Sequence, residues 1–434
     1  MKLQRIILSV CLLLFSLSVI QSQEVYLHCG TLLDMESNAA KKEQTIIVKD
    51  NKIVSVNNGY LNPTDDATVI DLKNKTVMPG WMDMHIHVES HPSKKSYEER
   101  FRMNEADVAL RATVDMRTTL LAGFTTVRDL GGSGVNVSMR NAINRGYVQG
   151  PRIFTAEKSL ATKGGHADPT NGFKRTLMGD PGPKEGVVNS IEDVRKAVRQ
   201  RYKNGADVVK VTATGGVLSV AKDGQGPQLT EEELRAIVVT AKDYGMTTAA
   251  HAHGDEGMQR AVRAGITSIE HGTKMSSETM DLMKQKGTYY VPTITAGKYV
   301  AKKAEEPGYY PNIIIPKARE IGPLIQETFS KAYKRGVKIA FGTDAGVFPH
   351  GENANEFIYM TEVGMSPMEA LKSATVTPAE MLNQSDQLGS IKAGKLADII
   401  AMESNPLEDI NAVLNVIFVM KNGVVESSAM AKNK

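Results

Sequence analysis

Cysteine is almost absent from this sequence of 434 residues, which contains only two. Cys11 lies in an apolar run at the N-terminus, and Cys29 lies in a short strand-like segment that follows it. Removal of the N-terminal run would leave a single cysteine, so no intramolecular disulfide could form. The fold must then be held by the packing of apolar side chains, and by metal if the protein binds any.

A surplus of charge of either sign is also absent. The sequence has 52 Lys and Arg against 49 Asp and Glu, which gives a formal net charge of +3. Two of the positive charges belong to Lys2 and Arg5 in the N-terminal run, so the rest of the chain is nearly neutral. Without a basic run or stripe, the sequence gives no support to nucleic-acid binding. The hydrophobic content of 41% is that of an ordinary globular protein.

Long hydrophobic runs are missing beyond the N-terminus. The apolar run at residues 6–20 follows two basic residues and is followed by the small polar Ser22. This pattern predicts a secretory signal peptide, residues 1–22, cleaved just after Ser22. A run of about 15 apolar residues is short for a membrane span. We therefore expect an exported protein, periplasmic or secreted, with no membrane association after cleavage.

Short β-like segments occur in two sets, one at each end of the mature chain. Residues 23–77 alternate such segments with turns, and residues 386–434 do the same. The pairs Asn58-Gly59 and Asn422-Gly423 are typical of hairpin turns. We predict that the two ends form one small composite β-sandwich domain.

The middle of the chain, residues 78–385, alternates apolar strand-like runs with amphipathic helical patterns. Strands that alternate with helices predict an α/β fold with a parallel sheet. Eight such units over roughly 300 residues fit a (β/α)8 TIM barrel. A doubly wound open sheet is the alternative, but no G-x-G-x-x-G motif follows an early strand.

Two connections in this middle region are unusually long for a compact domain. Residues 158–190 are rich in Gly and Pro, and residues 296–316 contain the sequence PGYYP. Connections of this length are typical of lids and binding loops. Lys163, Arg175 and Lys298 lie in them and are candidates for binding a substrate carboxylate.

Ionisable side chains stand on the predicted strands, mostly where these end. His85 and His87 end the first strand at positions i and i+2, so both side chains leave it on the same side. The later members are Lys210 within the fourth strand, His251 and His253 at the end of the fifth, His271 at the end of the sixth and Asp344 at the end of the eighth. In a (β/α)8 barrel the carboxyl ends of the strands meet at one mouth, so these residues would be neighbours.

Each of these residues has an ordinary explanation when it is taken alone. A strand-end histidine is more often a hydrogen-bonded scaffold residue than a ligand, and an Asp such as Asp344 in GTDAG is most simply a turn or cap residue. An unpaired lysine inside an apolar strand costs several kcal/mol. Their occurrence together favours a metal site, whose nitrogen and oxygen ligands suit zinc best, with manganese, cobalt and iron as alternatives.

Reaction of Lys210 with CO2 would resolve the cost of burying its charge. The carbamate that forms has two oxygens, and it could bridge two divalent metal ions. Two metals about 3.5–4 Å apart would then share this bridge and a hydroxide.

The segments PGWMDMHIHV, VVKVTATGG, AAHAHG, SIEHGT and FGTDAG resemble those of the amidohydrolase superfamily. The likeness is strongest to its branch of exported dizinc amidases and dipeptidases. This branch is related to imidazolonepropionase and includes prolidase-type Xaa-Pro dipeptidases and ochratoxin-hydrolysing amidases. The resemblance covers nearly the whole mature chain.

The resemblance implies the ligands of two metal ions. His85 and His87 would bind the first metal together with Asp344. Lys210, as N6-carboxylysine, would bridge this metal to the second.

The remaining histidines would complete the site. His251 and His271 would bind the second metal, and His251 is preferred over His253 because it directly follows the apolar strand in AAHAHG. His253 would then lie close to the substrate. His166, in the GGHAD of the first long loop, matches a histidine that the family directs at the scissile carbonyl.

The function so predicted is hydrolysis of an amide or peptide bond in a small substrate, a dipeptide such as Xaa-Pro or an N-acyl amino acid. The metal-bridging hydroxide would attack the carbonyl while His166, with His253, stabilises the oxyanion. Asp344 would carry a proton to the leaving nitrogen. The resemblance also implies a homo-oligomer.

Three other functions remain open from the sequence. The mononuclear deaminases of the superfamily place an acidic residue soon after the strand-five histidine and need no strand-four lysine. Here Glu256 follows His251 five positions later and Lys210 is present, which favours amide hydrolysis. A lactonase or esterase would use the same site, and a non-catalytic binding relative would keep only the barrel.

Overall fold

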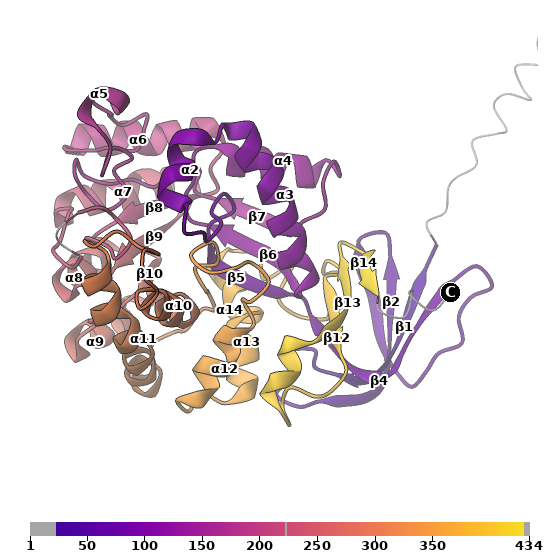
Figure 1. Cartoon of the computed structure of the whole chain (residues 1–434). Coiled ribbons are helices and arrows are strands. Elements are labelled where there is room, and N and C mark those ends of the chain that lie inside the picture. The colour runs from indigo at the N-terminus through magenta and orange to yellow at the C-terminus, as the bar shows by residue number, and fades with distance from the viewer. Residues whose placement is uncertain (1–22, 222–223, 429–434) are drawn as a thin grey trace, which may run out of the picture.

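The computed structural model describes residues 23–221 and 224–428 (Figure 1). The predicted signal peptide, residues 1–22, lies outside the described residues, and its prediction is not tested by the structure. Within the described part of the chain, no helix has both the length and the apolar character needed to cross a bilayer.

A seven-stranded sheet combines strands from both ends of the described chain, in the order β14-β13-β12-β4-β1-β2-β3. Its strands are β1 (Val25–Leu32), β2 (Lys41–Lys49), β3 (Lys52–Asn58), β4 (Thr68–Pro79), β12 (Ile399–Met402), β13 (Val416–Lys421) and β14 (Val424–Ser428). The two ends meet where β4 pairs antiparallel with β12, with Met78 opposite Ile400. The sheet has its own apolar core, which includes Leu27, Leu72 and Phe418.

Two parallel sheets lie beside it. One has three strands, β5 (Trp81–Ile86), β6 (Phe124–Asp129) and β7 (Arg152–Thr155), and the other has four, β8 (Val208–Thr212), β9 (Thr247–Ala252), β10 (Ser268–His271) and β11 (Tyr289–Val291). Isolated parallel bridges join the two sheets on both sides. The bridge Leu160–Val211 connects the segment after β7 to β8, and the bridges Tyr290–Ile339 and Ile86–Ala345 connect β11 to β5 through residues 339–345.

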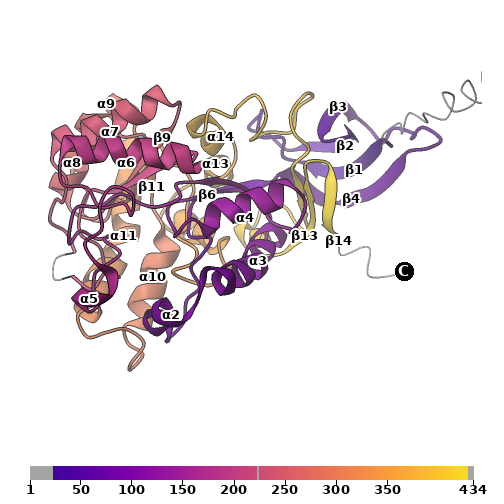
Figure 2. The same ribbon diagram turned by 90° about the horizontal axis from the view of Figure 1, so that it is seen from above.

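Helices surround the parallel strands at one end of the molecule, and the seven-stranded sheet lies at the other end (Figures 1 and 2). The helices are α2 (Ser96–Arg102), α3 (Glu105–Leu121), α4 (Val135–Asn144), α5 (Arg175–Met178), α6 (Ile191–Asn204), α7 (Glu231–Asp243), α8 (Asp255–Ala264), α9 (Ser277–Lys286), α10 (Ile294–Lys303), α11 (Ile315–Arg335), α12 (Asn355–Glu362), α13 (Pro367–Ser373) and α14 (Val376–Met381), with a short 3₁₀ helix at Ile410–Leu414. Left-handed glycines such as Gly205 and Gly336 end α6 and α11, as the sequence indicated.

The predicted first strand of the barrel is in fact two strands in different sheets. β4 ends at Pro79 and β5 begins at Trp81, so Gly80 is the point of transfer between the seven-stranded sheet and the parallel sheet. A Cβ atom on Gly80 would lie 2.2 Å from Oγ1 of Thr125 on β6. The close approach of the neighbouring strand therefore requires glycine here.

The predicted eighth strand is also irregular. Residues 337–346 form only isolated bridges, at Ile339 and Ala345, although Ala340 still donates a backbone hydrogen bond to Tyr290. The predicted strand is not regular, although residues 338–341 exchange backbone hydrogen bonds with β11 and β5, and φ of 64° at Asp344 ends the extended conformation.

The second predicted long loop is shorter than expected. α10 covers residues 294–303 and α11 begins at Ile315, so only residues 304–314 of the predicted 296–316 are irregular. The first predicted loop, residues 158–190, contains no regular element except the short α5.

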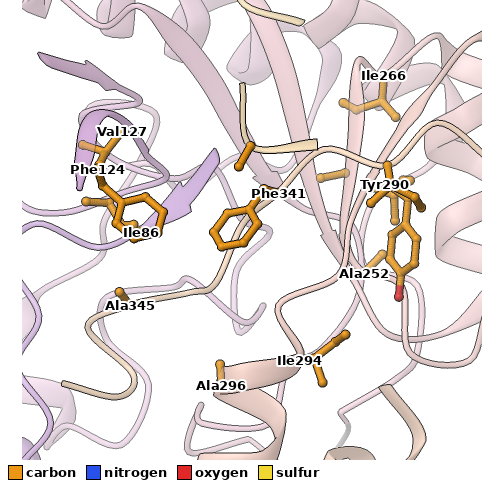
Figure 3. Packing of buried hydrophobic residues seen from close by; sticks show 14 of the residues in the cluster. Ile86, Phe124, Val127, Ala252, Ile266, Tyr290, Ile294, Ala296, Phe341 and Ala345 are labelled. Atoms are coloured by element: carbon orange, nitrogen blue, oxygen red, sulfur yellow. The ribbon is translucent and has the colours of Figure 1, made fainter. Parts of the chain in front are cut away.

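A cluster of aromatic rings packs where the parallel sheet begins. Trp81 on β5 lies 5.4 Å from Phe124 on β6 and 5.0 Å from Phe357 on α12, between ring centroids. Phe341 lies 4.3 Å from Phe357, so all four rings are in contact. Figure 3 shows Phe124 and Phe341 in this part of the core. These rings join the strand that carries His85 to the segment that carries Asp344.

Phe357→Ala is expected to leave a space beside Trp81 and to lower the free energy of unfolding by about 3–5 kcal/mol. Urea denaturation followed by the fluorescence of Trp81, the single tryptophan of the chain, would measure this loss. Tyr147→Ala is the control, because that side chain is 74% exposed and its loss should change stability by less than about 0.5 kcal/mol. Equal stability of the two variants would contradict a structural role for this cluster.

Candidate active site

One cavity of about 820 Å³ collects every residue that the sequence placed in the site. Its lining includes His85, His87, His166, Lys210, His251, His253, His271 and Asp344. These residues come from the ends of the parallel strands and from the loop that follows β7, so the fold brings them together as the strand-end pattern predicted. A cavity of this volume is ample for a small-molecule ligand.

The first pair of histidines shares one partner in the cavity. His85 lies near the end of β5, and its Nδ1 is 3.0 Å from Oε2 of Glu270. His87 follows β5, and its Nδ1 is 2.9 Å from the carbonyl oxygen of Gly131. The Nε2 atoms of the two rings lie 3.5 and 3.3 Å from the same oxygen, Oδ1 of Asp344. Both rings therefore hold one nitrogen against the protein and turn the other toward Asp344.

The second group of histidines is anchored in the same way. His271 places Nδ1 2.8 Å from Oγ1 of Thr293, and His253 places Nδ1 2.8 Å from Oγ1 of Thr273. His251 uses its other nitrogen, with Nε2 3.1 Å from the carbonyl oxygen of Gly215. Its Nδ1 is thus the nitrogen that remains for a ligand in the cavity.

Burial sets the protonation of most of these rings, whereas at His87 the neighbouring Asp344 outweighs burial and raises the pKa. It lowers the pKa of His85 to about 4, aided by the nearby Lys210, and lowers the pKa of His253 to about 4. Burial also carries the pKa of His251 and His271 well below the ordinary value. Neutral imidazole is the form that binds metal ions, so the cluster has ligand-competent histidines at neutral pH.

Lys210 is buried among these histidines with only 3% of its surface exposed. Its Nζ lies 3.4 Å from Nε2 of His85. Among the described residues, no carboxylate lies within ion-pair distance of this ammonium. Burial lowers the pKa of Lys210 to about 8, so an appreciable fraction is the neutral amine that can react with CO2.

Asp344 has an oxygen without a partner. Its Oδ1 is buried and accepts no hydrogen bond from the described protein. Burial acts to raise the pKa of Asp344, but the neighbouring His85 and His87 outweigh it, and the net shift is downward. The carboxylate is therefore ionised, with only the two histidine nitrogens beside this oxygen, and such a position suits a bound cation.

Backbone strain is concentrated at the same place. His271, Thr293 and Asp344 have φ of 71°, 58° and 64°, in the left-handed region that non-glycine residues rarely adopt. Each such residue costs on the order of 1–3 kcal/mol, and such strain is typical of functional sites. Two of the three are predicted ligands, and the third anchors one of them.

His166 reaches the cavity from the loop after β7. Its ring stacks on His251 with centroids 4.3 Å apart, and its buried Nδ1 has no protein partner among the described residues. A Cβ atom on Gly216 would lie 2.2 Å from Cε1 of this ring, so the ring fits only against glycine. Burial lowers the pKa of His166 to about 3.

Sequence reasoning missed the groups that hold the histidines. Arg128 on β6 is fully buried, and its Nη2 donates to Oε1 of Glu270 at 2.8 Å, while Glu270 fixes His85. Burial acts to raise the pKa of Glu270, but Arg128 and the bond from His85 lower it to about 2. A charged residue inside a predicted strand was the available signal, as it was for Lys210.

Other candidate residues lie elsewhere. His350 does not line the cavity, and its Nε2 is 3.1 Å from the carbonyl oxygen of Ser90. Lys163 is exposed and pairs with Asp180 at 2.6 Å, and Lys298 lies over the ring of Tyr359, 4.5 Å from its centroid. Neither lysine lines the cavity, and the side chain of Arg175 is outside the described part of the structure.

Comparison with known proteins now adds to this geometry. Residues 76–425 match the model of the amidohydrolase family. The chain belongs to this family. The predicted superfamily is confirmed, and with it the α/β fold, since the two bridged parallel sheets with their surrounding helices are those of the family's (β/α)8 barrel.

Similar proteins match over most of their length. The crystal structure of a Xaa-Pro dipeptidase with methionine bound in its active site is 50% identical, covers 94% of this chain and 100% of that one, and has a TM-score of 0.91. A prolidase in complex with N-methylphosphonate-L-proline is 32% identical over 94% of this chain and 100% of that one, with a TM-score of 0.87. Ochratoxinase of Aspergillus niger is 33% identical over 353 residues, 77% of this chain and 71% of that protein.

These relatives show that the chain is a hydrolase of amide or peptide carbon–nitrogen bonds. Members of this family generally bind divalent metals. Ligand atoms of His85, His271 and Asp344 lie within 4.8 Å of one another. Two atoms that are each about 2.0–2.1 Å from a tetrahedral zinc ion lie roughly 3.3–3.4 Å apart.

The observed separations agree with that spacing. The distances from Oδ1 of Asp344 to Nε2 of His87 and to Nε2 of His85 are 3.3 and 3.5 Å. The unpartnered oxygen of Asp344 and the single anchored nitrogen of each imidazole are further features of a metal-binding site. The residues fit a divalent metal centre.

The sequence predicts His271 as a ligand and His253 as a non-ligand, and their threonine partners allow a matched test. Thr293→Val removes the hydroxyl that anchors His271 and is expected to weaken metal binding about 10–100-fold. Thr273→Val makes the same change beside His253 and should leave metal affinity unchanged. Titration with a chelator would measure both. A loss of metal affinity in Thr273→Val alone would show that His253, and not His271, is the ligand.

Proposed function

We propose that this protein is an exported, metal-dependent dipeptidase or amidase that cleaves Xaa-Pro dipeptides or N-acyl amino acids. The observation that carries the proposal is the gathering of the histidines, Lys210 and Asp344 in one cavity, in a chain that is 50% identical to a Xaa-Pro dipeptidase over 94% of its length. The prolidase and ochratoxinase relatives support the same class of amide substrate. The export rests on the signal-peptide pattern of residues 1–22.

We assign the metal ligands as the sequence suggested. His85, His87 and Asp344 would hold one divalent cation, most simply zinc, and His251 and His271 a second. Lys210, carbamylated by CO2, would supply the oxygens between them. The chemistry that bound cations supply here is activation of a water molecule and polarisation of the carbonyl group.

The side chains of the cavity have separate tasks in the proposed reaction. Asp344 accepts the proton of the attacking water and delivers it to the leaving nitrogen, which a tertiary Xaa-Pro amide especially needs. The ring of His166 lines the cavity and its Nδ1 has no partner in the described protein, so this ring would donate to the carbonyl oxygen as it gains charge. His253, held by Thr273, lies beside His271 and positions the substrate.

The surrounding segments restrict the site to small substrates. Tyr97 on α2 donates a hydrogen bond of 2.9 Å to the carbonyl oxygen of Leu218, which connects α2 to the loop after β8. Lys94 pairs with Glu306 at 2.5 Å and connects the segment before α2 to the loop after α10. We propose that these links limit the access of long peptides. Assembly into a homo-oligomer stays a prediction.

The first test is a substrate panel with the purified, metal-loaded protein. Xaa-Pro dipeptides, N-acyl amino acids, lactones and amino-substituted heterocycles would be compared by product analysis. We expect release of amino acids from dipeptides or N-acyl amino acids, and loss of this activity on removal of metal with a chelator. Turnover of lactones or heterocyclic amines alone would refute the proposal.

The second test separates the roles of two residues. Lys210→Ala is expected to reduce the bound metal and to abolish activity, with partial recovery when a short carboxylic acid replaces the carbamate. Asp344→Asn should retain metal but lose at least about 10²-fold in kcat, because the proton carrier is gone. Metal analysis and kinetics would be run beside Lys196→Ala, which changes an exposed lysine of α6. Full activity of Lys210→Ala would contradict the carbamate.

A further inference from the structure

One wall of the cavity is apolar and belongs to a hydrophobic cluster of its own. This apolar wall consists of Val217, Val300, Tyr309, Tyr310, Ala318 and Ile321, all of which line the cavity. Each is at most 8% exposed, so the wall is shielded from bulk water. A cavity that holds hydrolytic residues at its base needs no such surface for the chemistry alone, since the reacting groups are polar.

Three tyrosine hydroxyls near this wall are already engaged within the protein. The hydroxyl groups of Tyr299 and Tyr309 lie 3.0 Å apart, and the hydroxyl of Tyr97 donates to the carbonyl oxygen of Leu218. Tyr309 and Tyr310 pack edge to face with centroids 4.8 Å apart. These tyrosines therefore offer ring surface, and a ligand at this wall gains mainly apolar contact.

The wall is also rigid because the two helices behind it are in close contact. A Cβ atom on Gly322 of α11 would lie 2.6 Å from the carbonyl oxygen of Gly297 on α10, and 2.5 Å from Cβ of Ala301. Both glycines line the cavity as well. Helices that are packed backbone to backbone have no room to move together, so the space between the apolar wall and the site does not collapse.

Other parts of the cavity lining are polar or charged. They include Ser93, Ser96, Glu99, Arg100 and Arg111, from α2, α3 and the preceding segment. The cavity thus presents both charged and apolar surface to one ligand. This combination suits a substrate with a polar backbone and an apolar side chain.

The apolar wall begins next to the reacting groups. Val217 directly follows Gly216, against which the ring of His166 packs. α10, which carries Val300, begins directly after Thr293, the residue that anchors His271. A side chain at this wall therefore belongs to a residue close to the scissile bond.

We propose that the apolar wall is a specificity subsite that takes a large apolar side chain, such as that of methionine, leucine or phenylalanine, from one of the two residues joined by the scissile amide. The proposal rests on the proposed function and names the substrate class within it. Glycine and alanine at that position would leave the subsite empty and lose its contribution to transition-state binding.

The test compares two dipeptide series on the metal-loaded protein. Gly-Pro, Ala-Pro, Met-Pro and Phe-Pro vary the acyl residue, and Met-Gly, Met-Ala and Met-Leu vary the leaving residue. We expect kcat/KM to rise at least about tenfold from the smallest to the largest side chain in one series. The series that responds identifies which residue the subsite holds. A flat response in both series would overturn the proposal.

Variants locate the effect at the wall. Val217→Phe fills the subsite, and Val300→Thr makes it polar at nearly constant shape. Each should lower kcat/KM for the preferred substrate about tenfold while changing that for the glycine substrate less than about twofold. Val239→Phe is the matched control, because this residue of α7 is 56% exposed and does not line the cavity. An equal loss for large and small substrates would show a purely structural role and overturn the proposal.

A binding measurement separates the two proposals. If no dipeptide or N-acyl amino acid is cleaved, the proposed function fails, and the subsite is then judged by calorimetric titration with L-methionine and glycine. Tighter binding of methionine that is lost in Val217→Phe and kept in Val239→Phe would support the subsite. Equal binding of the two amino acids would overturn it.

Discussion

The site depends on one constraint, namely that each strand-end imidazole has one ring nitrogen fixed by the protein. Glu270 and Gly131 fix the first pair, and Thr293, Thr273 and Gly215 fix the others. A ring fixed in this way has one tautomer and one orientation, so the remaining nitrogen is preorganised to bind a cation or substrate. The buried ion pair between Arg128 and Glu270 extends this support through the centre of the parallel strands.

The same arrangement lowers the free energy of unfolding. It buries neutral histidines, a lysine and a carboxylate, and it holds His271, Thr293 and Asp344 in left-handed backbone conformations. Such features persist only where the surrounding structure over-determines them. Here the aromatic cluster around Trp81 and Phe341 packs directly beneath the segments that carry His85 and Asp344.

Features that follow from the alternation of apolar and polar residues could be predicted from the sequence. Strands alternating with helices predicted the α/β fold, and placing His85, His271 and Asp344 at strand ends predicted their convergence. The departures in the first and eighth strands have local causes, because Gly80 transfers the chain between sheets and Asp344 ends the extended conformation of the last segment. Thr293, Gly131 and Gly215 could not be predicted, since a hydroxyl or carbonyl that anchors a distant ring leaves no pattern in its own segment. The apolar wall was equally hidden, because its residues come from separate elements.

The pairing of β4 with β12 has a consequence for the order of events in folding. β4 leads through Gly80 into the strand that carries His85, yet its partner strand begins only at Ile399, after the whole of the parallel-strand region. Contacts between residues so distant along the chain form slowly, because a long loop must close first. During synthesis one edge of β4 therefore waits unpaired until the C-terminal strands emerge. The seven-stranded sheet can therefore be completed only after β12 has been synthesised and has paired with β4.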